Sequence, residues 1–258
     1  MSFKRLTVTS AFIIFFFYAG LIISLAWFWD GAIFAESLQA KRTYYAIGLS
    51  ITAATIATLL ALAFALPAAY ALSRLTFKGK MVLDTILELP MIVSPAALGA
   101  MLLIFFNNPL GVWVQANMVQ FVFTFYGIVL AQFITILGVS TRLIKAALDE
   151  IPGRYEDVAR SLGASHFQAF FSITLPLCKR GIFAAAILTW AKALGEFGAT
   201  LTIAGSMPMK TETLPIAIFM RLASAEIEES VVLIVMLISI GLVILYGLRV
   251  MSGWSRHA

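Results

Sequence analysis

The sequence predicts an all-α integral membrane protein with six transmembrane helices, and three observations support this class. Hydrophobic residues make up 61% of the 258 residues and charged residues only 12%, about half the share of roughly 25% found in soluble domains. Several apolar segments are long enough to cross a hydrocarbon core about 30 Å thick. Short polar segments separate them. The chain, residues 1–258, is therefore predicted to be one membrane domain with both ends in the cytoplasm.

The first apolar segment, residues 6–29, carries no charge and follows Lys4 and Arg5. A cleaved signal peptide also begins with basic residues, but its apolar part is about 7–15 residues long and leads to a small-residue cleavage site. No clear site of that kind follows here. Trp27 and Trp29 instead fit the aromatic belt of a membrane interface. Residues 6–29 are therefore expected to form the first transmembrane helix.

The later crossings are predicted from apolar segments of the same kind. A polar loop at 30–42 precedes the second crossing, and an uncharged stretch at 89–141 is divided by Asn-Asn-Pro-Leu-Gly at 107–111. This division predicts two crossings, in which Pro90 and Pro95 act as tolerated kinks. The expected crossings after the first are residues 43–73, about 90–106, about 120–141, 181–200 and 231–248.

The distribution of basic residues predicts the orientation of the chain. With both ends inside the cell, cytoplasmic segments hold 13 Lys and Arg residues and outer segments hold four, namely Lys41, Arg42, Lys210 and Arg221. This asymmetry is the positive-inside pattern. Because the basic residues lie at membrane edges rather than in one patch interleaved with aromatics, the net charge of +5 does not indicate a nucleic-acid partner.

Residues 149–176 form a mixed-charge interruption between two apolar segments, on the predicted cytoplasmic face. Pro152 ends the incoming helix. A short helix with one apolar face is then predicted from residues at helical spacing, which are Tyr155, Val158, Ala159 and Leu162. Gly163 ends this helix, and a second helix with capping-box spacing opens at Ser165, with Pro176 closing the unit. The stretch is predicted to be a compact helix–turn–helix unit.

The same stretch resembles the EAA loop of ABC-importer permeases, with the pattern E-A-A-x3-G-x9-I-x-L-P. The matching residues are Asp157, Val158, Ala159, Gly163, Ile173, Leu175 and Pro176, with Asp and Val in place of the first Glu and Ala. In that family the loop is a coupling helix that docks into a separate ATP-binding subunit. The resemblance therefore implies contacts with an ATPase from Asp157, Val158, Ala159, Gly163, Ala164 and Ser165. An ordinary cytoplasmic helical hairpin is the alternative interpretation.

No catalytic centre is predicted from the residues present. The phosphate-binding pattern G-x-x-x-x-G-K-[ST] does not occur, and the only histidines are His166 and His257. The single cysteine, Cys178, excludes a cysteine-built metal site. Glu156 and Asp157 are adjacent, so they do not face each other on a helix. The chain is expected to be no enzyme and to hold no metal or cofactor, with ATP bound by a partner subunit.

Two charged residues fall inside the predicted fifth crossing. Lys192 and Glu196 are four residues apart, so on a helix they share a face and can pair. Charges at membrane depth are costly and are expected to face an aqueous path, unless they lie near the end of the crossing and extend to its interface. Small residues nearby allow close helix approach. The candidate translocation path and gate comprises Lys192, Glu196, Phe197, Gly198 and Thr200.

A second resemblance concerns residues 190–200, WAKALGEFGAT, and 213–218, TLPIAI. Both are similar to permeases of molybdate-type importers, whose group includes tungstate and sulfate relatives. The resemblance implies a homodimer in the cytoplasmic membrane of a prokaryote, two ATP-binding subunits and an extracytoplasmic oxyanion-binding protein. It implies molybdate import, with tungstate or sulfate and thiosulfate as alternatives. An ion-coupled secondary transporter using Lys192 and Glu196 as a relay, and an intramembrane enzyme, are more remote alternatives.

Overall fold

The computed structural model describes residues 3–251, which form helices joined by short connections, with no strand in that range. Five helical segments are long and apolar enough to cross a membrane. They are Phe3–Phe28 (α1, Phe3–Ser24, and a 3-10 turn), Lys41–Arg74 (α3), Phe125–Asp149 (α8), His166–Leu194 (α10 to α11) and Ile227–Leu248, within α14 (Ile227–Met251). The predicted all-α membrane class is confirmed. Arg256 and His257 lie outside the described residues.

The predicted third crossing at 90–106 is wrong in its extent. Three helices occupy this region, namely α4 (Lys80–Ile86), α5 (Leu89–Ile92) and α6 (Pro95–Asn107). The segment containing α4 and α5 is bent by 110° relative to α6. The described residues therefore hold five helices that are long and apolar enough to cross a membrane, or six candidate crossings if this bent pair counts as one. Pro95 begins α6, and Ser94 Oγ accepts from the Ala97 N–H at 3.3 Å. The prolines therefore start helices rather than kink one, since proline fits a first turn and breaks a helix interior.

The other crossings also differ in their bounds from the predicted ones. The fourth, α8, begins at Phe125 and continues past the predicted end at 141 to Asp149. The fifth begins at His166 and ends at Leu194, so it does not continue to residue 200. Helical propagation needs only local hydrogen bonds, so α8 extends beyond the apolar stretch into polar sequence.

Helices also occur where connections were predicted. The segment at 30–42 contains α2 (Gly31–Gln39), and Asp30 caps it by accepting from the Ala32 N–H at 2.7 Å. The other short helices of the connections are α7 (Pro109–Asn117), α12 (Gly198–Ala204) and α13 (Leu214–Ala223). The predicted loop at 30–42 is therefore wrong.

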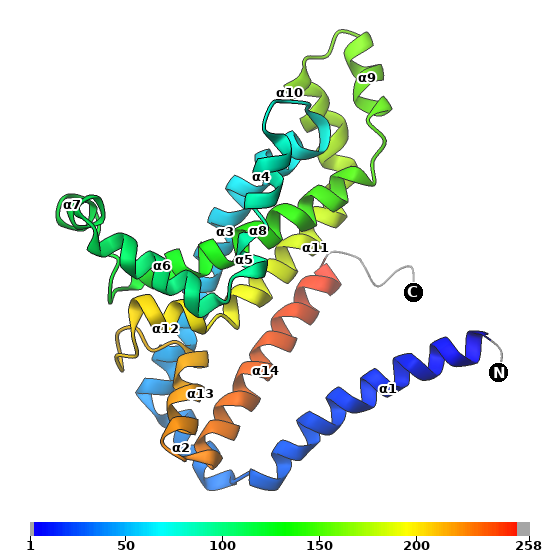
Figure 1. Cartoon of the computed structure of the whole chain (residues 1–258). Helices are drawn as coiled ribbons and strands as arrows, with labels where there is room; N and C mark the ends of the chain where they lie inside the picture. The colour runs from blue at the N-terminus through cyan, green and yellow to red at the C-terminus, as the bar shows by residue number, and fades with distance from the viewer. Residues whose placement is uncertain (1–2, 252–258) are drawn as a thin grey trace.

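The core of the molecule is the bundle of α3, α8 and α11 (Leu175–Leu194) (Figure 1). Alanines of α3 are fully buried at this contact, namely Ala53, Ala54, Ala57, Ala61, Ala65 and Ala69. Small side chains let membrane helices approach closely. By contrast, α1 has no buried residue and extends away from the bundle.

Two ends of the bundle are distinct in Figure 1. The helices α9 (Arg154–Ser161) and α10 (His166–Ala169) lie at one end, and α2 and α13 lie at the opposite end. The 34-residue helix α3 runs between them. At one side, α6 packs on α12 so tightly that a Cβ on Gly99 would lie 2.8 Å from the Ala199 Cα atom.

Candidate functional site

The short helix α9 projects from the bundle and has sharply defined ends. It follows Pro152-Gly153 and ends before Gly163, which has a left-handed φ of +93°. The Ala164 N–H returns to the Ala159 carbonyl at 3.1 Å. A glycine at this position suits a helix C-terminus because it has no Cβ to strain the left-handed conformation. The predicted stop at Gly163 is confirmed.

The next helix opens with the predicted capping box. Ser165 Oγ accepts from the Gln168 N–H at 3.2 Å, and the Gln168 side chain accepts from the Ser165 N–H at 2.8 Å. This helix does not close at Pro176, which is a correction. It runs from His166 through a π-helical turn at Phe170–Thr174 into α11, with Pro176 in the first turn of α11. The coupling-loop segment is therefore continuous with the fifth crossing.

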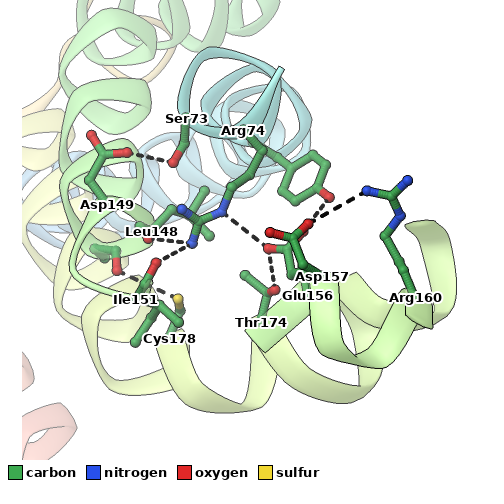
Figure 2. A network of polar contacts seen from close by, with 12 residues as sticks. Ser73, Arg74, Leu148, Asp149, Ile151, Glu156, Asp157, Arg160, Thr174 and Cys178 are labelled. Atoms are coloured by element: carbon green, nitrogen blue, oxygen red, sulfur yellow. Dashed lines mark hydrogen bonds and ion pairs between the residues drawn. The ribbon is translucent and has the colours of Figure 1, made fainter. Parts of the chain in front are cut away.

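One carboxylate holds α9 against the bundle, and it is Glu156 rather than Asp157 (Figure 2). Glu156 is 7% exposed. Its carboxylate accepts hydrogen bonds from Arg74 Nε at 3.1 Å, Tyr70 Oη at 2.8 Å and Thr174 Oγ1 at 2.5 Å. Arg74 and Tyr70 belong to α3, and Thr174 directly precedes α11. Hydrogen bonds to an ionised group are stronger than neutral ones, so Glu156 joins α9 to two helices of the bundle.

Arg74 extends this network to a third helix. Its Nη2 donates to the carbonyl oxygens of Leu148 at 2.8 Å and Ile151 at 2.6 Å, at the end of α8 (Figure 2). The last turn of a helix leaves C=O groups without the regular helical partner, and here the Leu148 carbonyl accepts from both Arg74 and the Ile151 N–H, the latter at 3.1 Å. Ser73 Oγ also donates to Asp149 Oδ1 at 2.5 Å. Helix α9 is thus fixed to α3, α8 and α11 together.

The opposite face of α9 is exposed and apolar. Val158 is 60% exposed and Leu162 is 85% exposed, and Tyr155 is also exposed. Of the four residues predicted to form the apolar face, only Ala159 is buried, so most of this face is free of contacts with the bundle. Exposed apolar groups clustered beside polar ones are typical of protein interaction surfaces. We call Tyr155, Val158 and Leu162 the docking face.

The remaining predicted coupling residues lie around this docking face. Asp157 has a side chain 74% exposed, with one oxygen 3.7 Å from Arg160 Nη1. Gly163 and Ser165 are exposed and Ala164 is half-buried at the turn between the two helices. All lie at the tip of the projection and are accessible to a partner.

The predicted pairing of Lys192 with Glu196 is wrong. Because α11 ends at Leu194, the two residues do not share a helical face, and no ion pair joins them within the described chain. Lys192 is exposed, whereas Glu196 is buried and its Oε1 accepts from the Ala199 N–H at 2.9 Å. Glu196 therefore caps the start of α12 and fixes the angle between α11 and α12.

The other candidate path residues lie at this junction. The Phe197 and Phe219 rings contact each other with centroids 4.7 Å apart and planes tilted by 43°, and a Cβ on Gly198 would lie 3.0 Å from the Ala96 backbone nitrogen. Thr200 is fully buried, and its hydroxyl has no protein partner among the described residues. The structure thus brings these residues to the contact of α12 with α6 and α8. Residues 3–251 hold no cluster of three potential metal-ligating side chains.

Sequence reasoning missed the four residues that attach α9 to the bundle, namely Arg74, Tyr70, Glu156 and Thr174. Arg74 and Glu156 are separated by 82 residues, so no local spacing relates them. The one available signal was position, since Arg74 closes a long apolar segment and a charge there needs a partner or water.

Comparison with known proteins agrees with this geometry. Residues 61–252 match the family model described as binding-protein-dependent transport system inner membrane component. The molybdenum transport system permease protein ModB of Escherichia coli is 36% identical over 182 residues, covering 68% of this chain and 78% of that protein. A probable molybdenum ABC transporter permease protein of Haloferax volcanii is 34% identical over 244 residues, covering 94% of this chain and 88% of that protein.

Two further relatives widen the comparison. The sulfate transport system permease protein CysW of Synechococcus elongatus is 34% identical over 185 residues, covering 71% of this chain and 65% of that protein. A crystal structure of a bacterial ABC transporter involved in the import of alginate has a TM-score of 0.77 at 20% identity and covers 98% of this chain and 95% of that chain. The latter similarity concerns the fold.

The fold and the sequence relatives define an inner-membrane transport component. The chain belongs to the family of binding-protein-dependent transport system inner membrane components and is the permease subunit of an ABC importer. The resemblance to ABC-importer permeases of the oxyanion group is confirmed. The relatives are transport permeases rather than enzymes, as predicted for this chain.

Proposed function

We propose that this permease imports molybdate across the cytoplasmic membrane as a homodimer, with two ATP-binding subunits and an extracytoplasmic binding protein. The observation that carries the substrate is the similarity to a molybdenum permease over 94% of the chain. Sulfate is the second candidate, because a sulfate permease shares 34% identity over 185 residues. Tungstate is a third tetrahedral dianion of the same class.

The proposed ATPase site is the projection formed by α9 and the start of α10. Its docking face is apolar and exposed, with Leu162 at 85% exposure, while Glu156 anchors the opposite face at 7% exposure. A helix held rigidly on one side and free on the other suits the transfer of motion from a docked subunit. The residues proposed to contact the ATPase are Asp157, Val158, Gly163, Ala164 and Ser165, together with Tyr155 and Leu162; Ala159, at 9% exposure, is buried and is not among them.

In the proposed cycle, ATP binding draws the two ATPases together and displaces both α9 helices. The crossings then change from inward- to outward-facing while the binding protein releases its anion. Gly198 lies at the tight contact of α12 with α6, which we propose as the gate together with the adjacent Phe197 and the buried Thr200. Lys192 is exposed and Glu196 caps a helix, an arrangement that does not favour a proton relay between them.

The path is proposed to hold no tight anion site, with selectivity supplied by the binding protein. Tight binding in the path would slow release, since affinity differences among related complexes lie mainly in the dissociation rate. Submicromolar binding of molybdate to the isolated permease would contradict this point.

Uptake of molybdate, tungstate and sulfate in cells with and without the gene tests the substrate. Each anion is supplied separately at the same low concentration. Loss of molybdate uptake alone supports the proposal, whereas loss of sulfate uptake alone indicates that the substrate is sulfate. Persistence of all three uptakes contradicts oxyanion import by this chain.

A further inference from the structure

The end of α3 opposite Arg74 carries a second charged anchor. Arg42 donates from Nε to Glu212 Oε2 at 2.7 Å and from Nη2 to Glu212 Oε1 at 2.6 Å. Glu212 is 1% exposed. Two parallel bonds between a guanidinium and a carboxylate fix orientation as well as distance. Arg42 therefore holds the backbone around Glu212 in a defined place beside the start of α3.

Glu212 belongs to the connection at 205–213, which directly follows α12. Two more contacts tie this connection and its end to α3. Tyr45 Oη donates to the Lys210 carbonyl at 3.3 Å, and the Leu214 N–H donates to Ser50 Oγ at 2.8 Å. The connection is also closed on itself, because the Met207 carbonyl accepts from the N–H groups of Lys210, Thr211 and Glu212 at 2.9–3.1 Å. It is therefore a compact unit attached to α3.

The same α3 helix holds α9 at its other end. It is assigned as one helix from Lys41 to Arg74, with Pro67 inside it. At 1.5 Å per residue its 34 residues extend about 51 Å. Arg74 and Tyr70 bind Glu156 at one end, and Arg42 binds Glu212 at the other. One helix thus connects the coupling segment to the segment that follows the proposed gate, through a buried carboxylate at each end.

We propose that α3 is a strut that transmits displacement of α9 to the 205–213 connection and so to α12. Arg42 and Glu212 are the positioning residues at the far end. This inference rests on the proposed coupling and gating function and adds the route between the two sites. The Arg42–Glu212 pair stays closed through the cycle, because a strut moves the connection only while it is attached.

The first test uses the complete importer in proteoliposomes, with molybdate-loaded binding protein. It measures molybdate imported per ATP hydrolysed, together with ATP hydrolysis in the absence of binding protein. In Arg42→Met and Glu212→Gln, imported molybdate per ATP is expected to fall about 3- to 30-fold. Hydrolysis without binding protein and the yield of assembled importer are expected to stay within about twofold, because the docking face is unchanged.

The double variant and a matched control separate positioning from general damage. The double variant Arg42→Met, Glu212→Gln is expected to lower the molybdate imported per ATP no further than either single variant, since each single change already removes the one contact that the two residues share. Arg221→Met removes ion pairs to Glu226 and Glu229 at the same end of the molecule and leaves both members of the Arg42–Glu212 pair in place, so the molybdate imported per ATP is expected to match the wild type. The strut proposal is contradicted if Arg42→Met and Glu212→Gln import as much molybdate per ATP as the wild type. It is also contradicted if Arg221→Met lowers this ratio as much as they do.

A second test asks whether the pair must open. Arg42→Cys and Glu212→Cys are introduced in a Cys178→Ser background and joined with a bifunctional methanethiosulfonate reagent. The strut predicts that molybdate imported per ATP is reduced in the unjoined double-cysteine variant, as in Arg42→Met, and rises when the two cysteines are joined. Loss of import on joining, with recovery on reduction, overturns it. If the wild-type importer takes up no oxyanion, the proposed function is wrong. If the wild type imports the anion and the variants import it equally well, only the strut proposal is wrong.

Discussion

The Glu156 carboxylate accepts a hydrogen bond from Arg74 Nε at 3.1 Å, although 82 residues separate the two in the sequence. Arg74 also holds the carbonyl oxygens of Leu148 and Ile151. Helix α9 is therefore attached to the ends of both α3 and α8 through one guanidinium group. A subunit that displaces α9 must move these two long helices with it or break a buried ion pair, which is costly.

Replacement of Glu156 is expected to destabilise the permease itself. Glu156→Ala leaves the guanidinium of Arg74 buried without its carboxylate, which costs about 3–5 kcal/mol in free energy of unfolding. Glu156→Gln is expected to cost less, because its amide oxygen can still accept from Thr174 and Arg74 at the Oε1 position, although Tyr70 loses its acceptor at Oε2. Denaturant unfolding of the detergent-solubilised permease measures both values.

The neighbouring carboxylate provides the control for this prediction. Asp157 is exposed and lies 3.7 Å from Arg160, so Asp157→Asn is expected to change stability by only about 0–1 kcal/mol. If Asp157→Asn destabilises the permease as much as Glu156→Ala does, the anchoring role assigned to Glu156 is wrong.

A charge on the docking face is expected to impair ATPase binding without unfolding the permease. Leu162 is 85% exposed, so Leu162→Asp should alter stability by no more than about 0.5 kcal/mol. Loss of an apolar contact at the centre of an interface costs about 2 kcal/mol or more, equivalent to about 30-fold in affinity. Affinity of the purified permease for its ATP-binding subunit is the measurement. Leu222→Asp, at an exposed leucine of α13, should leave that affinity unchanged, and equal losses in the two variants would refute the docking face.

The turn after α9 is expected to require glycine for its backbone alone. No atom lies within 4 Å of a Cβ built on Gly163, so an alanine side chain would meet no clash there. Its φ is +93°, however, so Gly163→Ala should lower the free energy of unfolding by about 1–2 kcal/mol. Gly163→Asn should cost less, because asparagine tolerates left-handed backbone better. Gly153→Ala, at φ −57°, is the matched control and should be neutral. Thermal unfolding of the three variants checks this order, and a neutral Gly163→Ala would contradict it.

Glu196 is expected to act through its oxygen rather than its charge. Glu196→Ala removes the acceptor for the Ala199 N–H and should cost about 1 kcal/mol in stability, with reduced import. Glu196→Gln keeps an oxygen acceptor and should retain most import in the proteoliposome assay. A charge relay would instead make Glu196→Gln as inactive as Glu196→Ala.

The features predicted correctly from the sequence are those that depend on a few adjacent residues. The Ser165 capping box and the glycine stop at Gly163 were both found, because each involves hydrogen bonds between residues at most five apart. The apolar segments also identified the membrane crossings, since a span needs only length and hydropathy.

The wrong predictions concern features that depend on where helices end and on contacts between distant parts of the chain. The pairing of Lys192 with Glu196 assumed an unbroken helix, but Gly195 follows its last residue, and glycine after an apolar helical stretch is a stop signal. The apolar face of α9 could not be assigned to core or surface from spacing alone. Arg42 and Glu212 lie 170 residues apart, a contact that no local pattern in one sequence predicts.

The close packing of α6 against α12 has a consequence for biogenesis. The 13 residues of α6 extend about 20 Å, short of a hydrocarbon core of about 30 Å. Its backbone ends therefore depend on protein neighbours for hydrogen-bonding partners within the bilayer, and α12, which packs on Gly99, leaves the ribosome about 100 residues later. The final depth of α6 in the bilayer is consequently set late in synthesis, after the chain beyond Ala204 has been made.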